Sequence, residues 1–271
     1  MTDESMATYN RRIEQVQKEI DEARKRPWKV APLLVLPWSG RPIPEMSDFV
    51  GELRWRLGCE RIQRGGTGVD WLRSALASEA LLSPFEWWLW CDNDNFHLVE
   101  RTVQMVAAAQ EHDLDMLACV IPCRAPSTWA NIGAVSEPQR IVLGAAGSIT
   151  PVSHAGLALA VTHRRVFERI RDCVKDDWVG WTGMHQVDIK TGVEAEQFDG
   201  YPFFIPFVEG RDYVKEDVAF CRRAIRSGSK LWADTSMVGL HATERFLGFS
   251  DIVKAEERRS EVRRMKEIEV D

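Results

Sequence analysis

The chain has 271 residues, of which 45% are hydrophobic, and its formal net charge is −6 at pH 7. This length is compatible with one large α/β domain, and the apolar content is sufficient to fill its core. The acidic balance provides no basic stripe for non-specific nucleic-acid binding. Since no apolar run of about 18 residues and no secretory leader is present, we expect a cytoplasmic protein without a membrane span.

The two ends of the chain each have a helical pattern. In residues 1–28, apolar side chains recur every three or four positions, which predicts an amphipathic helix. Residues 249–271 place Glu and Arg at i,i+4 spacings beside a few apolar positions, which predicts a second, charged helix. We expect these terminal helices to flank one domain at 29–248 and to offer a surface for homo-oligomer formation.

Short apolar runs alternate with amphipathic segments between these ends. Strands are predicted at 31–37, 86–91, 115–122, 155–162 and 230–234, and helices at 47–57, 69–82, 98–112, 163–175 and 216–227. Residues 58–68 and 176–214 are predicted as loops. The alternation indicates an α/β fold with a Rossmann-like, mostly parallel central sheet flanked by helices. In such sheets, ligands bind beyond the carboxyl ends of the strands.

The six cysteines have no CxxC spacing. Cys119 and Cys123 are the only close pair, and they would need distant partners to form a zinc site. We therefore predict buried free thiols, in keeping with the apolar surroundings of the cysteines.

The most distinctive motif is an aromatic strand, 85–91, that ends in Asp92-Asn93-Asp94. Carboxylates at positions i and i+2 of a strand end can converge on one hard cation, which keeps open positions for phosphate oxygens. Asp and Asn are also common in turns and helix caps, so a structural turn is the alternative. An EF-hand calcium loop is excluded, because His97 replaces the required glycine and Val103 the terminal glutamate.

A second group of chemically capable residues follows much later. Glu216 and Asp217 open a predicted helix, and His241 follows the last predicted strand. An acidic pair at a helix start also offsets the helix dipole, and a lone histidine is often structural, so neither feature identifies a site alone.

Together these motifs resemble those of GT-A-fold glycosyltransferases that use nucleotide sugars, of the family-2 type. The resemblance covers roughly residues 30–245 and rests on Asp92, Asp94, Ala155, Gly156, Glu216, Asp217 and His241. It implies a GT-A fold and a metal-dependent enzyme that transfers a sugar from a nucleotide sugar to an acceptor hydroxyl. A UDP-sugar is the expected donor in preference to a GDP-sugar.

The resemblance also implies roles for individual residues. Mn²⁺ or Mg²⁺ would be held by Asp92, Asp94 and His241, with Asp94 in direct contact and Asp92 closer to the ribose or a bridging water. Asp217 would be the general base of an inverting reaction, with Glu216 beside it. The expected donor-binding residues are Pro37, Trp38, Ser39, Arg64, Asp92, Asn93 and Asp94, and the expected acceptor-side residues are Ala155, Gly156 and Trp181.

Two other functions remain open at the level of sequence. A nucleotidyltransferase also joins an α/β sheet to acidic metal ligands, and a non-catalytic module can bind nucleotide sugars or carbohydrates. The acceptor, whether a saccharide, a small metabolite, a protein or a hydroxymethylated base in DNA, is also open. Net negative charge argues against DNA, although Trp181 and its loop can stack on a flipped base. The sequence leaves the stereochemistry of transfer undecided.

Overall fold

The structure is a computed structural model. It describes residues 29–38, 44–66, 68–122, 130–135, 141–144, 147–174, 184–187, 194–198, 200–242 and 246–247. The predicted terminal helices, Ser39, Cys123 and Trp181 lie outside the described residues. Among the described helices, none has the length and apolar character that a bilayer crossing requires.

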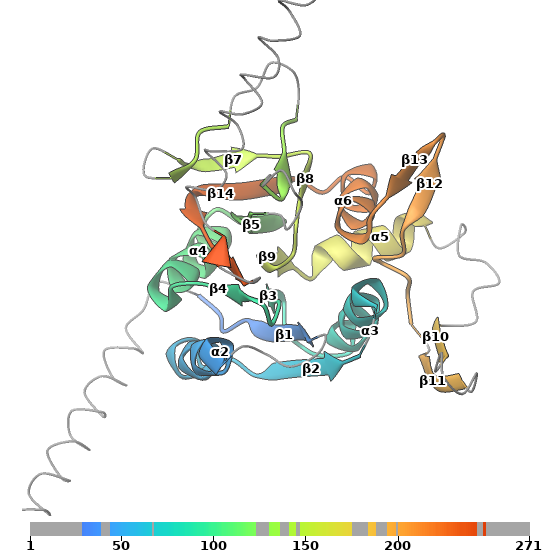
Figure 1. The fold of residues 1–271 in the computed structure, drawn as a ribbon, viewed down its shortest axis with the longest axis horizontal. Helices are drawn as coiled ribbons and strands as arrows, with labels where there is room; N and C mark the ends of the chain where they lie inside the picture. Colours follow the sequence, from blue (N-terminus) through green and yellow to red (C-terminus); the bar gives the residue numbers. More distant parts are fainter. Residues whose placement is uncertain are drawn as a thin grey trace, which may run out of the picture.

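A seven-stranded sheet lies at the centre of the described residues (Figure 1). Its strands are Leu33–Trp38 (β1), Arg61–Gly65 (β2), Trp87–Cys91 (β3), Met116–Val120 (β5), Ile149–Pro151 (β7), Leu159–His163 (β9) and Leu231–Val238 (β14). Their order is β2-β1-β3-β9-β5-β14-β7. β9 and β7 run antiparallel to the other strands. The predicted Rossmann-like, mostly parallel sheet is confirmed.

Helices cover both faces of this sheet (Figure 1). Pro44–Leu57 (α2) and Val99–Glu111 (α4) pack on one face, and Val69–Leu81 (α3), Arg165–Val174 (α5) and Glu216–Arg226 (α6) pack on the other. In β3, Trp87 and Leu89 face α2 and α4, while Trp88 and Trp90 face the other layer, where Phe167 packs against both indoles. Since both faces of β3 are buried, its sequence is apolar without alternation.

One short three-stranded sheet, in which Leu240–Ala242 (β15) is the middle strand, and three strand pairs surround the central sheet in the described part of the chain. They are Asn95–Phe96 (β4) with β15 and Phe246–Leu247 (β16), Ile132–Gly133 (β6) with His154–Ala155 (β8), Met184–Val187 (β10) with Glu194–Phe198 (β11), and Phe207–Glu209 (β12) with Asp212–Val214 (β13). The β12–β13 hairpin projects beside α6 (Figure 1).

Three sequence predictions are wrong in detail. Residues 58–68 are not all loop, because they contain the edge strand β2, whose residues are at most half-buried and give no apolar pattern. Residues 176–214 contain β10 to β13 rather than loop alone. The strand predicted at 155–162 is interrupted between β8 and β9, where the chain passes Gly156.

The free-thiol prediction is confirmed for the buried Cys59, Cys91, Cys119 and Cys221. Cys173 in α5 is also a free thiol, but it is exposed and is not among the buried residues of that helix.

Candidate active site

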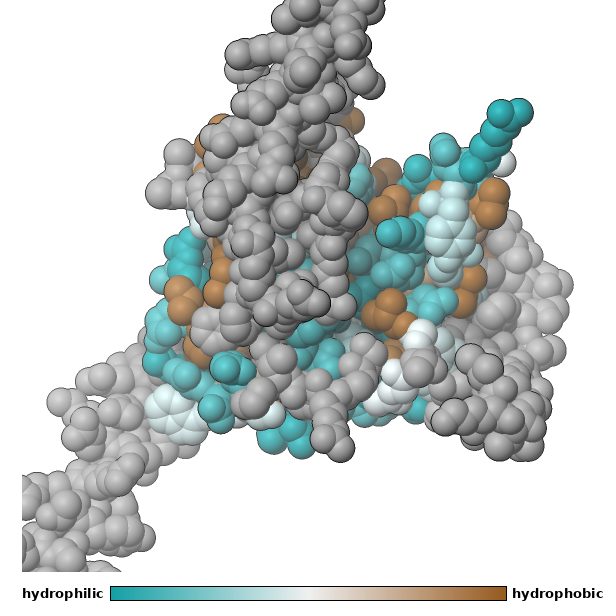
Figure 2. Space-filling model, in the orientation of Figure 1, coloured by the Kyte–Doolittle hydropathy of each residue, from teal (hydrophilic) through white to brown (hydrophobic). Residues whose placement is uncertain are grey.

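The candidate site lies where the order of the sheet reverses. From β1 the chain goes to β2 on one side and then, through α3, to β3 on the other side of β1. The carboxyl ends of β1 and β3 therefore border a topological switch point, where α/β sheets bind ligands. Asp92 directly follows β3 at this edge, and a recessed hydrophilic region is visible beside α6 on the face shown in Figure 2.

Asp92 is held at the edge of the sheet by its backbone. Its N–H donates to the carbonyl of Ala158, at 2.9 Å, which fixes the turn against the start of β9. One carboxylate oxygen, Oδ2, accepts a hydrogen bond from Arg73 Nη2 at 2.8 Å. The other, Oδ1, is buried and has no hydrogen-bond partner among the described residues. An orphaned carboxylate oxygen at a sheet edge is the kind of atom that a ligand satisfies.

Arg73 joins the two acidic motifs. It comes from α3, its side chain is 3% exposed, and its Nη1 donates to Asp217 Oδ1 while its Nη2 donates to Asp92. Glu216 Oε1 lies 3.8 Å from the same Nη1. A buried guanidinium with its planar fork can hold two carboxylates at once. Arg73 was not predicted from the sequence as a functional residue.

Burial and the positive charge of Arg73 act in opposite directions on the pKa of Asp217, and the carboxylates of Glu216 and Asp92 act in the same direction as burial. Burial is the largest influence and raises the pKa of Asp217 to about 6, while Arg73 and the hydrogen bond to the Leu157 backbone act to lower it. Burial also raises the pKa of Asp92, again with Arg73 in opposition. A carboxylate with a pKa near 6 is mostly ionised at pH 7, yet accepts a proton more readily than an exposed aspartate.

His241 is brought to Asp94 by strand pairing. β15 pairs antiparallel with β4, so that His241 stands opposite Asn95, the residue after Asp94. His241 Nε2 lies 3.8 Å from Asp94 Oδ2. Its Nδ1 lies 2.7 Å from the carbonyl oxygen of Pro122. Because a carbonyl only accepts, Nδ1 carries the hydrogen, and in the neutral ring Nε2 presents a lone pair.

This arrangement fits a cation. Metal–ligand distances are about 2.0–2.2 Å, so two ligands of one ion lie within about 4.4 Å of each other, and the 3.8 Å between Asp94 and His241 is within that limit. The hydrogen bond from Nδ1 to a backbone carbonyl is the usual orientation of a metal-ligating imidazole. Within the described residues, no three His, Cys, Asp or Glu side chains form a complete metal-binding group. Substrate oxygens or water would therefore complete the coordination.

The predicted donor-binding residues are spread over the carboxyl ends of three strands, β1, β2 and β3. Pro37 and Trp38 end β1, and the buried indole Nε1 of Trp38 has no hydrogen-bond partner among the described residues. Asn93, 4% exposed, follows Asp92 in the turn. Arg64 ends β2 beside them, where its Nε forms an ion pair with Glu79 at 3.1 Å. Trp38 and Asn93 thus lie at the switch point, whereas Arg64 extends from the edge strand towards α3.

Ala155 and Gly156 pack against Cys221 of α6 and against Asn131. The side chain of Ala155 is buried, and its N–H donates to the thiol sulfur of Cys221 on α6. A Cβ on Gly156 would lie 2.7 Å from Asn131 Nδ2, so only glycine fits there without displacing Asn131. Both residues belong to the closely packed segment that precedes Leu157. Their role on the acceptor side stays a prediction.

Comparisons with known proteins add little about function. No protein-family model matches this sequence, and no curated protein matches it significantly. The chain is similar to the crystal structure of A197 from STIV, at 14% identity and a TM-score of 0.49, over 80% of this chain and 90% of that chain. It is also similar to the crystal structure of apo-UDP-glucose pyrophosphorylase, at 10% identity and a TM-score of 0.38, over 92% of this chain and 87% of that chain. At these distances neither likeness identifies a function, which therefore has to be argued from the site.

Proposed function

We propose that the protein is a divalent-metal-dependent glycosyltransferase of the GT-A type, which transfers a sugar from a nucleotide sugar to an acceptor hydroxyl. The observation that supports this most is a convergence of side chains at one sheet edge. The Asp94–His241 pair and the Asp217 carboxylate approach this edge from different elements, and Arg73 connects Asp217 to Asp92. A cation site beside a base with a raised pKa suits sugar transfer to a hydroxyl, because the ion stabilises the leaving group and the base accepts the proton.

Three carboxylates, from Asp92, Glu216 and Asp217, lie around the guanidinium of Arg73, and a fourth, from Asp94, lies beside His241. These negative charges repel a diphosphate, so donor binding here needs positive charge in addition to that of Arg73. A bound Mn²⁺ or Mg²⁺ would neutralise the charge that grows on the nucleoside diphosphate as it leaves. Asp94 and His241 would hold the ion, and Asp92, already bonded to Arg73, would contact it through water or bind the ribose.

On the acceptor side, Asp217 would remove the proton from the attacking hydroxyl. Arg73 holds Oδ1 of this carboxylate, which orients the group and keeps it ionised at neutral pH. Glu216 lies farther from the guanidinium, at 3.8 Å. We therefore assign proton transfer to Asp217 and a supporting role to Glu216.

The reaction can be separated from nucleotidyl transfer by its products. The protein should release UDP slowly from a UDP-sugar in the presence of Mn²⁺, with water as acceptor, and faster with a suitable acceptor. Formation of pyrophosphate from a nucleoside triphosphate and a sugar 1-phosphate would instead identify a nucleotidyltransferase. Tight binding of the UDP-sugar without turnover, with every acceptor class tried, would indicate a binding module.

Asp94→Asn should remove metal-dependent donor binding. The amide lacks the negative charge that holds a hard cation beside His241, so Mn²⁺ should no longer increase the affinity for UDP, a loss of about 10–100-fold. Isothermal titration of UDP with and without Mn²⁺ measures this. Asp212→Asn, at an exposed position in β13, is the matched control. Equal metal enhancement in Asp94→Asn and in the unaltered protein would contradict the assignment.

The pH dependence of kcat/KM should reflect the protonation of Asp217. A base must be deprotonated to act, so kcat/KM should fall as pH decreases through about 6, the value to which burial raises its pKa. A profile between pH 5 and 8 under Mn²⁺ saturation measures the acidic limb. A flat profile down to pH 5 would exclude a base with this pKa.

A further inference from the structure

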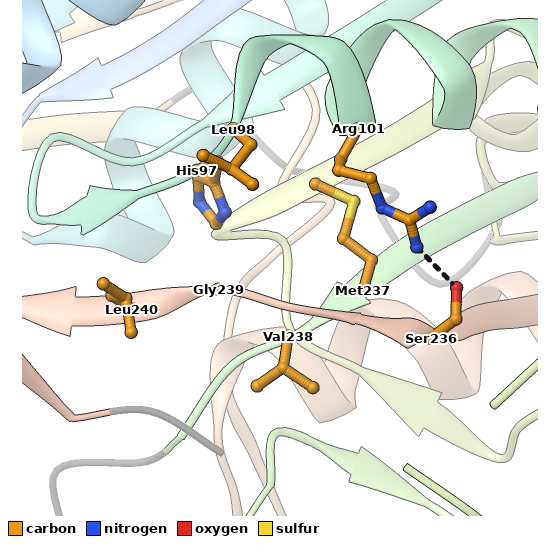
Figure 3. A pocket seen from close by; sticks show the side chains of 8 residues that line it. All are labelled: His97, Leu98, Arg101, Ser236, Met237, Val238, Gly239 and Leu240. Atoms are coloured by element: carbon orange, nitrogen blue, oxygen red, sulfur yellow. Dashed lines mark hydrogen bonds between the residues drawn. The ribbon is translucent and has the colours of Figure 1, made fainter. Parts of the chain in front are cut away.

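A pocket lined by residues outside the candidate active site lies between the start of α4 and the end of β14, next to β15 (Figure 3). Its volume is about 330 Å³, which is the size of a small-molecule site. Leu98, Met237 and Leu240 form much of its apolar wall, and the polar groups His97, Arg101 and Ser236 complete it. The glycosyl-transfer proposal uses none of these side chains.

His97 is the most informative of them. It is 3% exposed, and neither ring nitrogen has a hydrogen-bond partner among the described residues. Burial lowers the pKa of His97 to about 3, so the ring is neutral at pH 7 and carries one N–H donor and one acceptor nitrogen. An imidazole buried without partners destabilises the fold, since its desolvation is not compensated. A bound ligand that supplies the missing hydrogen bonds is one explanation for keeping such a group.

Arg101 gives the pocket its charge. Its Nη2 donates to Ser236 Oγ at 2.8 Å, and Ser236 Oγ lies 2.5 Å from Asp234 Oδ1. Arg101 Nη1 also donates to Gln104 Oε1, at 3.2 Å. These bonds orient the guanidinium, and the N–H groups that they do not use are left for a ligand. Figure 3 shows Arg101 and His97 both extending from the α4 side, with Met237 between them.

The start of α4 adds to the positive potential. Its N-cap residue, Leu98, has no side-chain cap, so the first backbone N–H groups of this 13-residue helix are not satisfied by a cap. A neighbouring pocket of about 300 Å³ also borders His97, but it is lined by negatively charged side chains, those of Glu45, Asp48, Glu52 and Glu100. An anion near His97 is therefore favoured on the Arg101 side.

We propose that this pocket binds a small organic anion, a carboxylate or phosphate monoester with an apolar part, through Arg101 and His97. The anionic group pairs with the guanidinium and accepts the N–H of His97, and the apolar part contacts Met237 and Leu240. This site does not depend on the proposed glycosyl transfer. It adjoins the strand that carries His241, so the two sites share β15.

Histidine NMR tests the proposal directly. The chain has six histidines, few enough to follow with ¹⁵N-labelled histidine. Phenyl phosphate and benzoate, added without metal, should shift the His97 ring-nitrogen signals along a saturating curve with a Kd of about 1 mM or tighter. Inorganic phosphate should bind more weakly because it lacks the apolar part, and neutral benzyl alcohol should not saturate. Absence of a saturable shift with both organic anions would overturn the proposal.

Two variants locate the binding. Arg101→Met should weaken phenyl phosphate binding at least about tenfold, since the charge is lost while the length of the side chain is kept. Arg54→Met, an exposed position on α2, is the matched control and should bind normally. Asp94→Asn should also bind normally, which separates this pocket from the metal site. Equal affinity of Arg101→Met and Arg54→Met would contradict the proposal.

His97→Phe distinguishes a ligand contact from a structural histidine. Phenylalanine keeps a ring against Phe49 and removes both unsatisfied nitrogens. The variant should therefore melt about 2–6 °C higher than the unaltered protein and no longer bind phenyl phosphate. Circular dichroism during thermal unfolding measures the change in Tm, and isothermal titration with phenyl phosphate measures the loss of binding. A lower Tm with unchanged binding would show that His97 serves the fold instead.

Discussion

Replacing Asp217 by asparagine should lower kcat about 10²–10⁴-fold, the usual contribution of a positioned general base. The amide oxygen can still accept the hydrogen bond from Arg73 that Asp217 Oδ1 accepts now, so the local geometry should persist. Donor binding in the presence of Mn²⁺ should therefore stay the same. Initial rates of UDP release under saturating donor, with titration of UDP as the binding measurement, test both statements.

Glu216→Gln is the matched control for this change. Glu216 has the same charge, stands in the same first turn of α6, and lies 3.8 Å from the guanidinium, so its loss should cost less than about tenfold. The anomeric configuration of the product, followed by NMR, should be inverted, because a base on the acceptor belongs to single displacement. Retention of configuration, or near-normal turnover by Asp217→Asn, would remove Asp217 from the reaction.

The elements that the sequence predicted best are those buried on both faces. β3 is apolar at every position because helices cover both of its faces, and this made the acidic turn after it conspicuous. Glu216 and Asp217 were recognisable because a helix start follows directly from the apolar pattern of α6. In contrast, β2 pairs only with β1 and is at most half-buried, so its composition resembles a loop.

The connections within the site were not readable from the sequence. His241 lies beside Asp94 because β15 pairs with β4, and strands of two or three residues leave no periodic pattern. Arg73 does not stand out in the sequence, since most arginines are exposed. One clue was available in the sequence: the residues of α3 around Arg73 are almost entirely apolar or small. In the structure this part of the helix, from Trp71 to Ala77, is buried. A cation in such a helix needs a buried anion, although the sequence does not say which one.

Arg73→Met should destabilise the protein by about 2–4 kcal/mol at pH 7, because it leaves the partly buried carboxylates of Asp92 and Asp217 without their counter-ion. Urea unfolding at pH 5 and pH 7 measures this loss. Arg56→Met is the matched control: Arg56 also contacts two carboxylates, Glu52 and Glu100, but these are largely exposed, so the cost should be below about 1 kcal/mol. Losses of similar size in the two variants would mean that the cluster around Arg73 is not the electrostatic centre of the site.

The pH dependence of this loss has a definite sign. Without Arg73, the influence that lowers the pKa of Asp217 and Asp92 is gone, and burial alone should raise both pKa values further above those of the unfolded chain. A carboxyl with a raised pKa in the folded state destabilises the fold above that pKa and ceases to do so when it is protonated. Arg73→Met should therefore be less destabilised at pH 5 than at pH 7, and the acidic limb of any remaining activity should move above pH 6. Adding Asp217→Asn to Arg73→Met should restore part of the stability, since one unpaired charge is removed, and a double-mutant cycle without such recovery would contradict a direct Arg73–Asp217 coupling.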